Sequence, residues 1–243
     1  MGRGVWDGGR RRDGARRLNG AARRAFIVAN TAVHLVPHAP ELRLHLADEA
    51  VSLWQRTEEE LAEEGLPPPF WAFAWAGGQG LARWLLDHGD EVAGRSVLDF
   101  ASGSGVAGVA AARAGAIRVR CVDIDPFCAS AAALNAELND VAVDTATDDV
   151  IGRDRSALGA PDIVLVGDAH YERGFAARST PWLEGLAGEG ARVIVGDPGR
   201  SYFPRDRGWR EIARYEVPVI RDLEDREVRS VGVWEVPASR SAG

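Results

Sequence analysis

A glycine-containing segment carries the strongest chemical signal in the sequence: Val-Leu-Asp-Phe-Ala-Ser-Gly-Ser-Gly, residues 97–105. Glycine suits a turn where a ligand must approach the backbone closely, because a Cβ atom would obstruct it. The spacing of Gly103, Gly105 and Gly108 also satisfies the dinucleotide fingerprint, and an acid, Asp123, follows Gly103 at the expected distance. These residues predict a nucleotide-like ligand, and their spacing alone leaves NAD open.

Asp99, at the end of the strand before this turn, separates two ligand classes. Its carboxylate would repel a pyrophosphate but attract the cationic amino group of S-adenosylmethionine. Asp123 can accept both ribose hydroxyls, whereas Asp125 should point the other way on an extended chain. Asp148 or Asp149, after a third strand, would reach the adenine amino group. The acids together favour S-adenosylmethionine over NAD.

The elements that must position these acids alternate between short β-branched runs and helical runs. Strands are predicted over 96–100, 118–122, 163–167 and 192–196, and helices over 79–88, 106–114, 126–138 and 180–186. Two last runs, 215–220 and 228–236, have no clear helix between them and are predicted to form an antiparallel hairpin. This order predicts an α/β fold, a mostly parallel sheet with helices on both faces.

The N-terminal part has a different pattern. From Glu41 to Glu64 apolar residues recur at steps of three and four, which predicts an amphipathic helix ended by the prolines at 67–69. We therefore expect a helical segment over 25–76 packed on a core domain over 77–236. An Arg/Gly-rich disordered extension over 1–24 and a flexible tail over 237–243 are expected to flank them.

The charge is distributed unevenly, and all 29 basic residues are arginine. Residues 1–24 carry +6 and the whole chain −7, so the remainder carries −13. A body this acidic disfavours a nucleic-acid partner, and no apolar run approaches the roughly 20 residues of a membrane helix. We expect a cytoplasmic monomer. His34 and His38 are separated by Pro37, and two cysteines form no zinc pair, so no metal is expected.

Several motifs carry a family resemblance. The segment 99–105 with Val-Asp-Ile-Asp-Pro at 122–126 resembles the seven-strand, Rossmann-like methyltransferases. Four further segments resemble the lysine methyltransferases that act on the electron-transfer flavoprotein β-subunit: 70–79 (Phe-Trp-Ala-Phe-Ala-Trp-Ala-Gly-Gly-Gln), 134–139, 167–171 and 196–200. The similarity runs from about Phe26 to Trp234. One departure is Ala101, where the family usually has glycine.

The resemblance implies a seven-strand sheet with a C-terminal antiparallel hairpin, S-adenosylmethionine as cofactor, and N-methylation of a lysine in a protein substrate. It also implies that Gln79 contacts the cofactor carboxylate and that Trp75 forms a wall, although Trp75 could equally be a packing ring. The expected cofactor contacts are Trp75, Gln79, Asp99, Ala101, Ser102, Gly103, Gly105, Asp123, Ile124, Asp149 and Gly167.

The candidate acceptor residues are Asp168 and Tyr171, just past the strand at 163–167. A lysine amine with a pKa of ~10.4 is neutral only about once in 2,500 at pH 7, yet only the neutral form can accept a methyl group. Since a carboxylate beside the amine would by itself raise the amine pKa, we expect Asp168 to capture and orient it rather than act as a strong base. Tyr171 would orient the nitrogen. The alternative for Asp168 is a turn cap.

Other functions stay open at this point. The acceptor could be a ribosomal-protein lysine or a small-molecule amine, and the glycine spacing also allows an NAD-dependent oxidoreductase or a cofactor-binding scaffold. DNA adenine methylation is disfavoured because Gly-Asp-Ala-His-Tyr, residues 167–171, lacks the prolines that stack a flipped base. His170 has no predicted role. Arg200 could pair with an acidic substrate surface or with Asp197.

Overall fold

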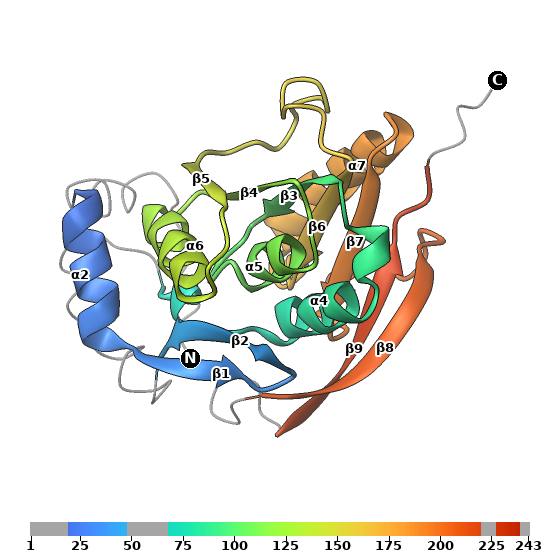
Figure 1. The fold of residues 1–243 in the computed structure, drawn as a ribbon. Coiled ribbons are helices and arrows are strands. Elements are labelled where there is room, and N and C mark those ends of the chain that lie inside the picture. Colours follow the sequence, from blue (N-terminus) through green and yellow to red (C-terminus); the bar gives the residue numbers. More distant parts are fainter. Residues whose placement is uncertain (1–18, 48–67, 220–226, 239–243) are drawn as a thin grey trace, which may run out of the picture.

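The computed structural model describes residues 19–47, 68–219 and 227–238 of the chain (Figure 1). Its centre is a seven-stranded sheet in the order β5-β4-β3-β6-β7-β9-β8. The strands are β3 (Ser96–Phe100), β4 (Arg118–Asp123), β5 (Asp144–Thr147), β6 (Ile163–Gly167), β7 (Arg192–Asp197), β8 (Arg210–Pro218) and β9 (Val228–Glu235). The first five are parallel, and β9 runs antiparallel to both β7 and β8. The predicted sheet and C-terminal hairpin are confirmed.

The central strands are rich in apolar residues because both faces of the sheet are covered, and β6 is apolar over its whole length. Alternate residues of one strand enter two separate cores: in β6, Leu165 packs with one layer of helices, whereas Val164 packs on the opposite face. This alternation fixes the register, since a slip of one residue would exchange the two faces. The rigid sheet therefore presents its carboxyl ends at defined positions.

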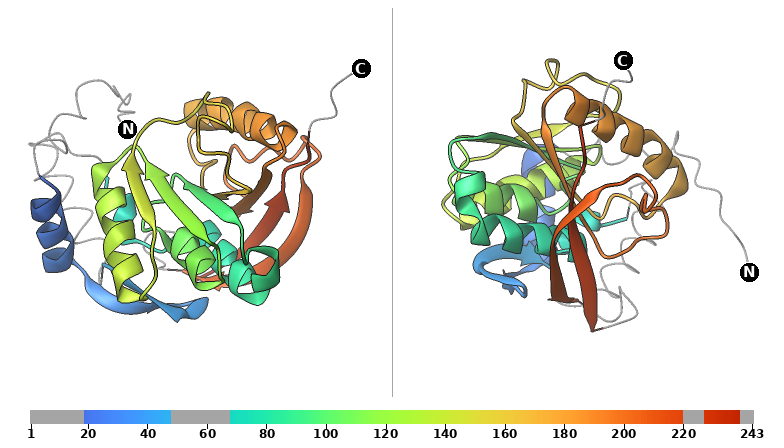
Figure 2. Two further views of the ribbon diagram at one scale, coloured as in Figure 1. Left: turned by 45° about the horizontal axis from the view of Figure 1, so that its top comes forward. Right: turned by 90° about the vertical axis from the view of Figure 1, so that its right-hand side faces the viewer.

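Helices form the outer layers. On one face lie α4 (Ala76–Asp87), α5 (Val106–Arg113) and α6 (Pro126–Leu138), and on the other lies α7 (Arg173–Gly188), as Figure 2 shows. Two 3₁₀ turns, η1 (Phe70–Ala72) and η2 (Gly89–Glu91), flank α4. Helix α7 begins seven residues before its predicted start because Glu172 caps it, accepting hydrogen bonds from the amides of Gly174 and Phe175 at 2.7 and 2.6 Å.

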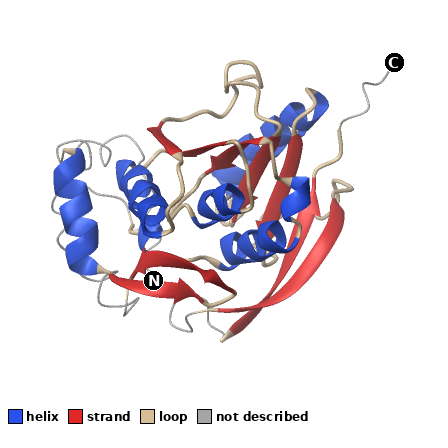
Figure 3. Cartoon of the chain, viewed as in Figure 1, coloured by secondary structure: helices blue, strands red, loops and turns tan. Residues whose placement is uncertain are grey.

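The predicted helix over 41–64 is wrong where the structure describes it. The chain forms α2 (Gly20–Asn30) and then an antiparallel hairpin of β1 (Ala32–Val36) and β2 (Ala39–Leu46) (Figure 3). Leu42 and Leu46 fit a strand period as well as a helical one, and Leu44 is buried beside them. Side chains of α6 hold this strand: the oxygens of Asn135 and Asn139 accept its amides at 2.7 and 3.0 Å.

The predicted extension over 1–24 also needs correction at its end. Residues 20–24 belong to α2, where Arg24 pairs with Glu137 of α6 at 2.6 Å and Arg23 donates to Ser130 at 3.2 Å. The rest of that extension, the predicted helix beyond 47 and most of the predicted tail lie outside the described residues. Within the described part of the chain, no helix combines the length and apolar character that a bilayer crossing requires.

Candidate functional site

One acid lies near the carboxyl end of each of the four central strands. Asp99 lies in β3, Asp123 ends β4, Asp168 follows β6 and Asp197 ends β7. The strand order reverses between β3 and β6, and parallel sheets place their ligands at such a switch point, beyond the carboxyl ends of the strands. The fold therefore gathers these four carboxylates at one edge of the sheet.

The turn after β3 has the shape of a cradle. Ala101, Gly103 and Gly105 have φ values of 54°, 52° and 76°, in the left-handed region. At the φ of Ala101 glycine would be the favoured residue, since a Cβ costs about 1 kcal/mol in that region. A Cβ on Gly105 would lie 2.6 Å from the Cβ of Ala132 in α6. The hydroxyl of Ser102 is buried and has no hydrogen-bond partner among the residues that the structure describes.

Asp99 lies beneath this turn and is 2% exposed. Its Oδ2 accepts the Gly108 amide of α5 at 2.9 Å. Burial, together with the charge of Asp123, raises the pKa of Asp99 to about 7, although the hydrogen bond from the Gly108 amide opposes this rise. A cation placed at this carboxylate would stabilise its ionised form.

Asp123 braces the loop from the next strand. Its two oxygens accept the amides of Gly103 and Asp125, both at 3.0 Å, and burial raises its pKa. Asp125 turns the other way, as the strand alternation predicts, and caps α6 through the Phe127 amide at 2.9 Å. Ile124 between them is 53% exposed. Asp123 is thus the acid that borders the glycine turn.

The acids after β5 are engaged in surface ion pairs. Asp148 pairs with Arg153 at 2.8 Å, and Asp149 with Arg178 of α7 at 3.0 Å. Both aspartates lie near the outer edge of the sheet, away from β6 and β7. One oxygen of Asp149 is thus engaged by Arg178 on the surface.

Aromatic side chains cover the glycine turn from the N-terminal segment. Phe70 lies with its ring centroid 5.9 Å from Trp75 and 5.7 Å from Tyr171, and its carbonyl oxygen would be 3.7 Å from a Cβ on Gly103. The indole of Trp75 donates to that same carbonyl at 3.0 Å. Tyr171 is 51% exposed, and burial of its hydroxyl raises its pKa to about 12. These rings bring the predicted Trp75 and Tyr171 beside the turn.

Gln79 has a structural role in this arrangement. Its Oε1 accepts the His38 amide at 3.1 Å, and its Nε2 donates to the carbonyls of Ala74 and Pro218 at 2.7 and 3.3 Å. The side chain is 2% exposed and ties the N-terminal hairpin and β8 to α4. Its amide is therefore committed to the protein backbone.

Asp168 is held by two elements. Its Oδ1 accepts Nε and Nη2 of Arg200 at 3.0 and 2.5 Å, and its Oδ2 accepts the Gly78 amide of α4 at 3.1 Å. Arg200 thus pairs with Asp168 through its guanidinium, and its backbone amide donates to Asp197. The sequence did not predict this pair, and its one signal was an arginine in the distinctive Gly-Asp-Pro-Gly-Arg motif.

The floor of this site is made of glycine. Gly77 of α4 and Gly196 of β7 are so close that a Cβ on either would lie 2.2 Å from the other's carbonyl oxygen. A Cβ on Gly167, the last residue of β6, would lie 3.1 Å from Gly78. The start of α4 therefore rests directly on the ends of β6 and β7, which brings it to Asp168.

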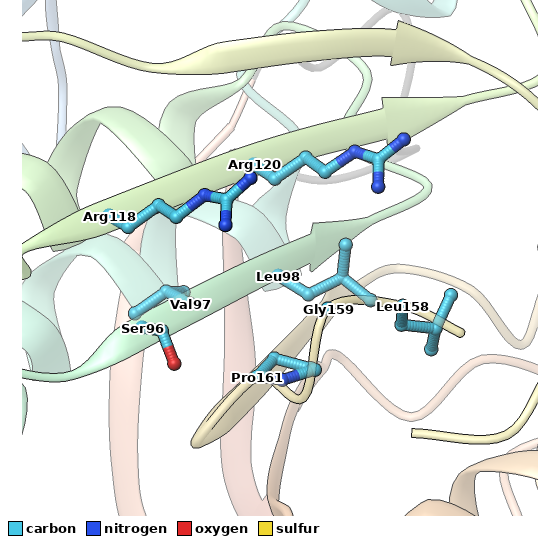
Figure 4. Close-up of a pocket in the computed structure, with 8 residues that line it drawn as sticks. All are labelled: Ser96, Val97, Leu98, Arg118, Arg120, Leu158, Gly159 and Pro161. Carbon is cyan, nitrogen blue, oxygen red and sulfur yellow. The ribbon is translucent and has the colours of Figure 1, made fainter. Parts of the chain in front are cut away.

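A separate pocket lies at the other end of the strands. Ser96, Leu98, Arg118, Arg120 and Leu158 are among the residues that line it (Figure 4). Ser96 and Arg118 begin β3 and β4, whereas the acids lie at the strand ends. This pocket therefore does not belong to the candidate site.

Known proteins are similar in sequence to this chain over most of its length. The family model of ribosomal protein L11 methyltransferase (PrmA) matches residues 84–165. The electron transfer flavoprotein beta subunit lysine methyltransferase of Danio rerio is 35% identical over 215 residues, which cover 86% of this chain and 81% of that protein. Its counterpart in Xenopus laevis is 34% identical, over 90% of this chain and 88% of that protein.

The fold is also shared with solved structures. One, described as a candidate S-adenosylmethionine-dependent methyltransferase from Streptococcus mutans, superposes with a TM-score of 0.54 at 13% identity. The match covers 85% of this chain and 56% of that chain. At this identity the likeness establishes the fold alone.

Proposed function

Since the chain belongs to the family of electron transfer flavoprotein beta subunit lysine methyltransferases, we propose that it methylates a lysine of that flavoprotein subunit or of a similar protein. Membership makes the chain an S-adenosylmethionine-dependent protein-lysine methyltransferase. Beyond family membership, we propose the identity of the target protein.

The residues around the glycine turn fit S-adenosylmethionine. The buried hydroxyl of Ser102 has no hydrogen-bond partner among the described residues, the turn has the left-handed backbone that suits close approach of a ligand, and Asp99 is a buried acid suited to the cofactor's ammonium group. When bound, the cofactor supplies an electrophilic methyl group. We assign its ribose hydroxyls to Asp123 and one wall of its site to Trp75.

Further cofactor contacts follow from the same placement. Ala101, Gly103 and Gly105 form the cradle, and Ile124 and Gly167 border it at the ends of β4 and β6. We assign the adenine amino group to Asp149, whose carboxylate keeps acceptor capacity beside its ion pair with Arg178. We assign Gln79 a supporting role.

Asp168 and Tyr171 are proposed as the acceptor residues. Asp168 is 8% exposed, and its partner Arg200 lies over the Trp75 ring. The backbone of Asp168 is in a left-handed conformation, with φ of 53°. Such a conformation is uncommon for residues other than glycine and concentrates at functional sites. The carboxylate would orient the amine, and the exposed ring of Tyr171 would border the lysine side chain.

The alternatives have less support. The match to the ribosomal protein L11 methyltransferase model ends at residue 165, before Asp168, so it covers the cofactor half and not the acceptor loops. The flavoprotein methyltransferases are similar over 86% and 90% of the chain. An NAD-dependent oxidoreductase is disfavoured because Asp99 would repel a diphosphate.

Direct transfer to purified flavoprotein tests the proposal. The enzyme is incubated with labelled S-adenosylmethionine, electron transfer flavoprotein, ribosomal protein L11 and a small-molecule amine in one mixture, and modified lysines are mapped by mass spectrometry. We expect label on the flavoprotein β-subunit. Label on the ribosomal protein or the amine alone would replace the proposed acceptor, and the D168N variant serves as the inactive control.

Cofactor binding is expected to weaken at acid pH. Below pH about 7 Asp99 of the free protein is protonated, so binding the cofactor's cation must release that proton, and Kd should rise up to about tenfold per pH unit. Titration calorimetry from about pH 8 to about pH 5.5 measures this slope. Asp99→Asn should bind more weakly at high pH, by about tenfold or more, and should flatten the slope. If this variant shows the same slope as the parent, Asp99 does not bind the cofactor's ammonium group.

We also propose a compartment and an oligomeric state for the protein. Cys121 and Cys128 are both free thiols, which suits a reducing compartment, and we propose the cytoplasm. We further propose a monomer that does not bind nucleic acid, because the chain beyond the first 24 residues carries −13.

A further inference from the structure

Asp168 and Arg200 form an ion pair, which determines the charge that an acceptor amine would meet beside Asp168. Both side chains are largely shielded, with exposed fractions of 10% and 18%, and the guanidinium gives two donors to one carboxylate oxygen. A pair with this geometry and burial is far more persistent than a surface ion pair. Asp168 therefore meets its substrate as part of a neutral pair.

The loop that carries Arg200 is anchored by Asp197. One oxygen of Asp197 accepts the amides of Gly199 and Arg200, both at 2.7 Å, and the other lies 3.3 Å from Nδ1 of His170. The side chains of His170 and Asp197 are completely buried. The guanidinium also lies over the Trp75 ring, 5.9 Å from its centroid. The fold thus fixes the position of Arg200 from several sides.

A lysine amine must be neutral to accept a methyl group, and an isolated carboxylate beside it would favour the ammonium. We propose that Arg200 is a positioning residue of the acceptor site, which holds Asp168 and cancels its charge, so that Asp168 orients the acceptor amine without keeping it protonated. This inference rests on the proposed function and deepens it.

The chemical step balances under this arrangement. The acceptor ammonium releases one proton to water, and the freed lone pair on nitrogen forms the new N–C bond. The S–C bond of the methyl donor breaks as this bond forms, and the sulfur keeps its electron pair. The carboxylate of Asp168 takes no proton in this scheme, which suits a group already bonded to Arg200 and to the Gly78 amide.

Other groups near Asp168 do not supply this charge balance. The N-terminus of α4 points a backbone amide at Oδ2 and adds a partial positive charge. Tyr171, whose pKa burial raises to about 12, stays neutral in the working range. The buried pair of His170 and Asp197 lies behind the loop of Arg200. Arg200 places a full positive charge on the carboxylate through its two hydrogen bonds.

The test compares Arg200→Gln, Arg200→Lys and a matched control, Arg205→Gln. Arg205 is exposed, follows in the same loop and donates to the Gly199 carbonyl at 3.0 Å, so its replacement removes one positive charge without touching Asp168. The readout is kcat/KM for purified electron transfer flavoprotein from about pH 6.5 to about pH 10. Calorimetry with S-adenosylmethionine checks that each variant retains its cofactor site.

For Arg200→Gln we expect the acid limb of the profile to move up by about one pH unit or more, with about a tenfold loss at pH 7 that shrinks toward high pH. Arg200→Lys should keep most of the parent profile, and Arg205→Gln should keep all of it. A loss of equal size at every pH, or a gain at pH 7, would overturn the inference. A parent enzyme that never labels the flavoprotein would overturn the proposed function, and this inference with it.

Discussion

Asp168→Asn is expected to reduce kcat/KM for the protein acceptor by about a hundredfold or more, while S-adenosylmethionine still binds. Asparagine keeps the size of the side chain and one oxygen acceptor. It removes the charge that pairs with Arg200, so the guanidinium is left beside the acceptor amine without its counter-charge. The amine then loses both its orienting carboxylate and the neutral surroundings that the pair provides.

The measurement combines labelled-methyl transfer with calorimetric titration of the cofactor. Asp144→Asn is the matched control, because Asp144 is an exposed acid of β5 that pairs with Arg118 at 3.4 Å on the surface. It should retain the parent's activity. Parent-level transfer by Asp168→Asn would show that Asp168 only shapes its turn. Loss of cofactor binding would show that Asp168 belongs to the cofactor site and not to the acceptor site.

Gly77→Ala is expected to destabilise the protein by about 3 kcal/mol and to abolish transfer. The added Cβ would lie 2.2 Å from the Gly196 carbonyl oxygen and 2.6 Å from Oδ2 of Asp168. Gly78 and Gly80 of the same helix are packed equally closely, since a Cβ on them would lie 2.8 Å from Val106 and 2.6 Å from Val231. The substitution therefore separates α4 from the sheet at the acceptor site.

The control for this glycine is Gly185→Ala in helix α7. That position is exposed, and no atom lies within 4 Å of the Cβ that alanine would add. Alanine should stabilise the helix by about 0.5–1 kcal/mol, since glycine loses more backbone freedom on folding. Urea unfolding followed by tryptophan fluorescence should show opposite shifts for the two variants. Equal stability of Gly77→Ala and the parent would contradict the packing at the floor of the site.

The parallel sheet and its glycine turn could be predicted because their signals are local. Strands buried on both faces appear as short apolar runs, and the turn requires residues that tolerate a left-handed backbone. Asp99 and Asp123 could be placed at one edge from strand direction alone. These inferences need only the chain within about ten residues of each position.

The N-terminal hairpin could not be predicted in the same way. Leucines at 42 and 46 satisfy a helical and an extended period equally, and the choice was made by contacts with α6, whose Asn135 and Asn139 accept the amides of β2. These partners lie some 90 residues further along the chain. Gln79 is similar, since its amide bonds to His38, 41 residues before it.

The sequence by itself determined the class of fold, the position of Asp99 and Asp123 at one edge of the sheet, and the family, because hydrophobic period, glycine spacing and motif identity are properties of short segments. Only the tertiary structure decided which charges meet. Asp168 and Arg200 lie in different loops, 32 residues apart, and the sequence of neither loop predicts that these two residues pair. Their pairing results from the adjacency of β6 and β7 and from two glycines that let α4 approach, and this pairing sets the charge that an acceptor amine would encounter.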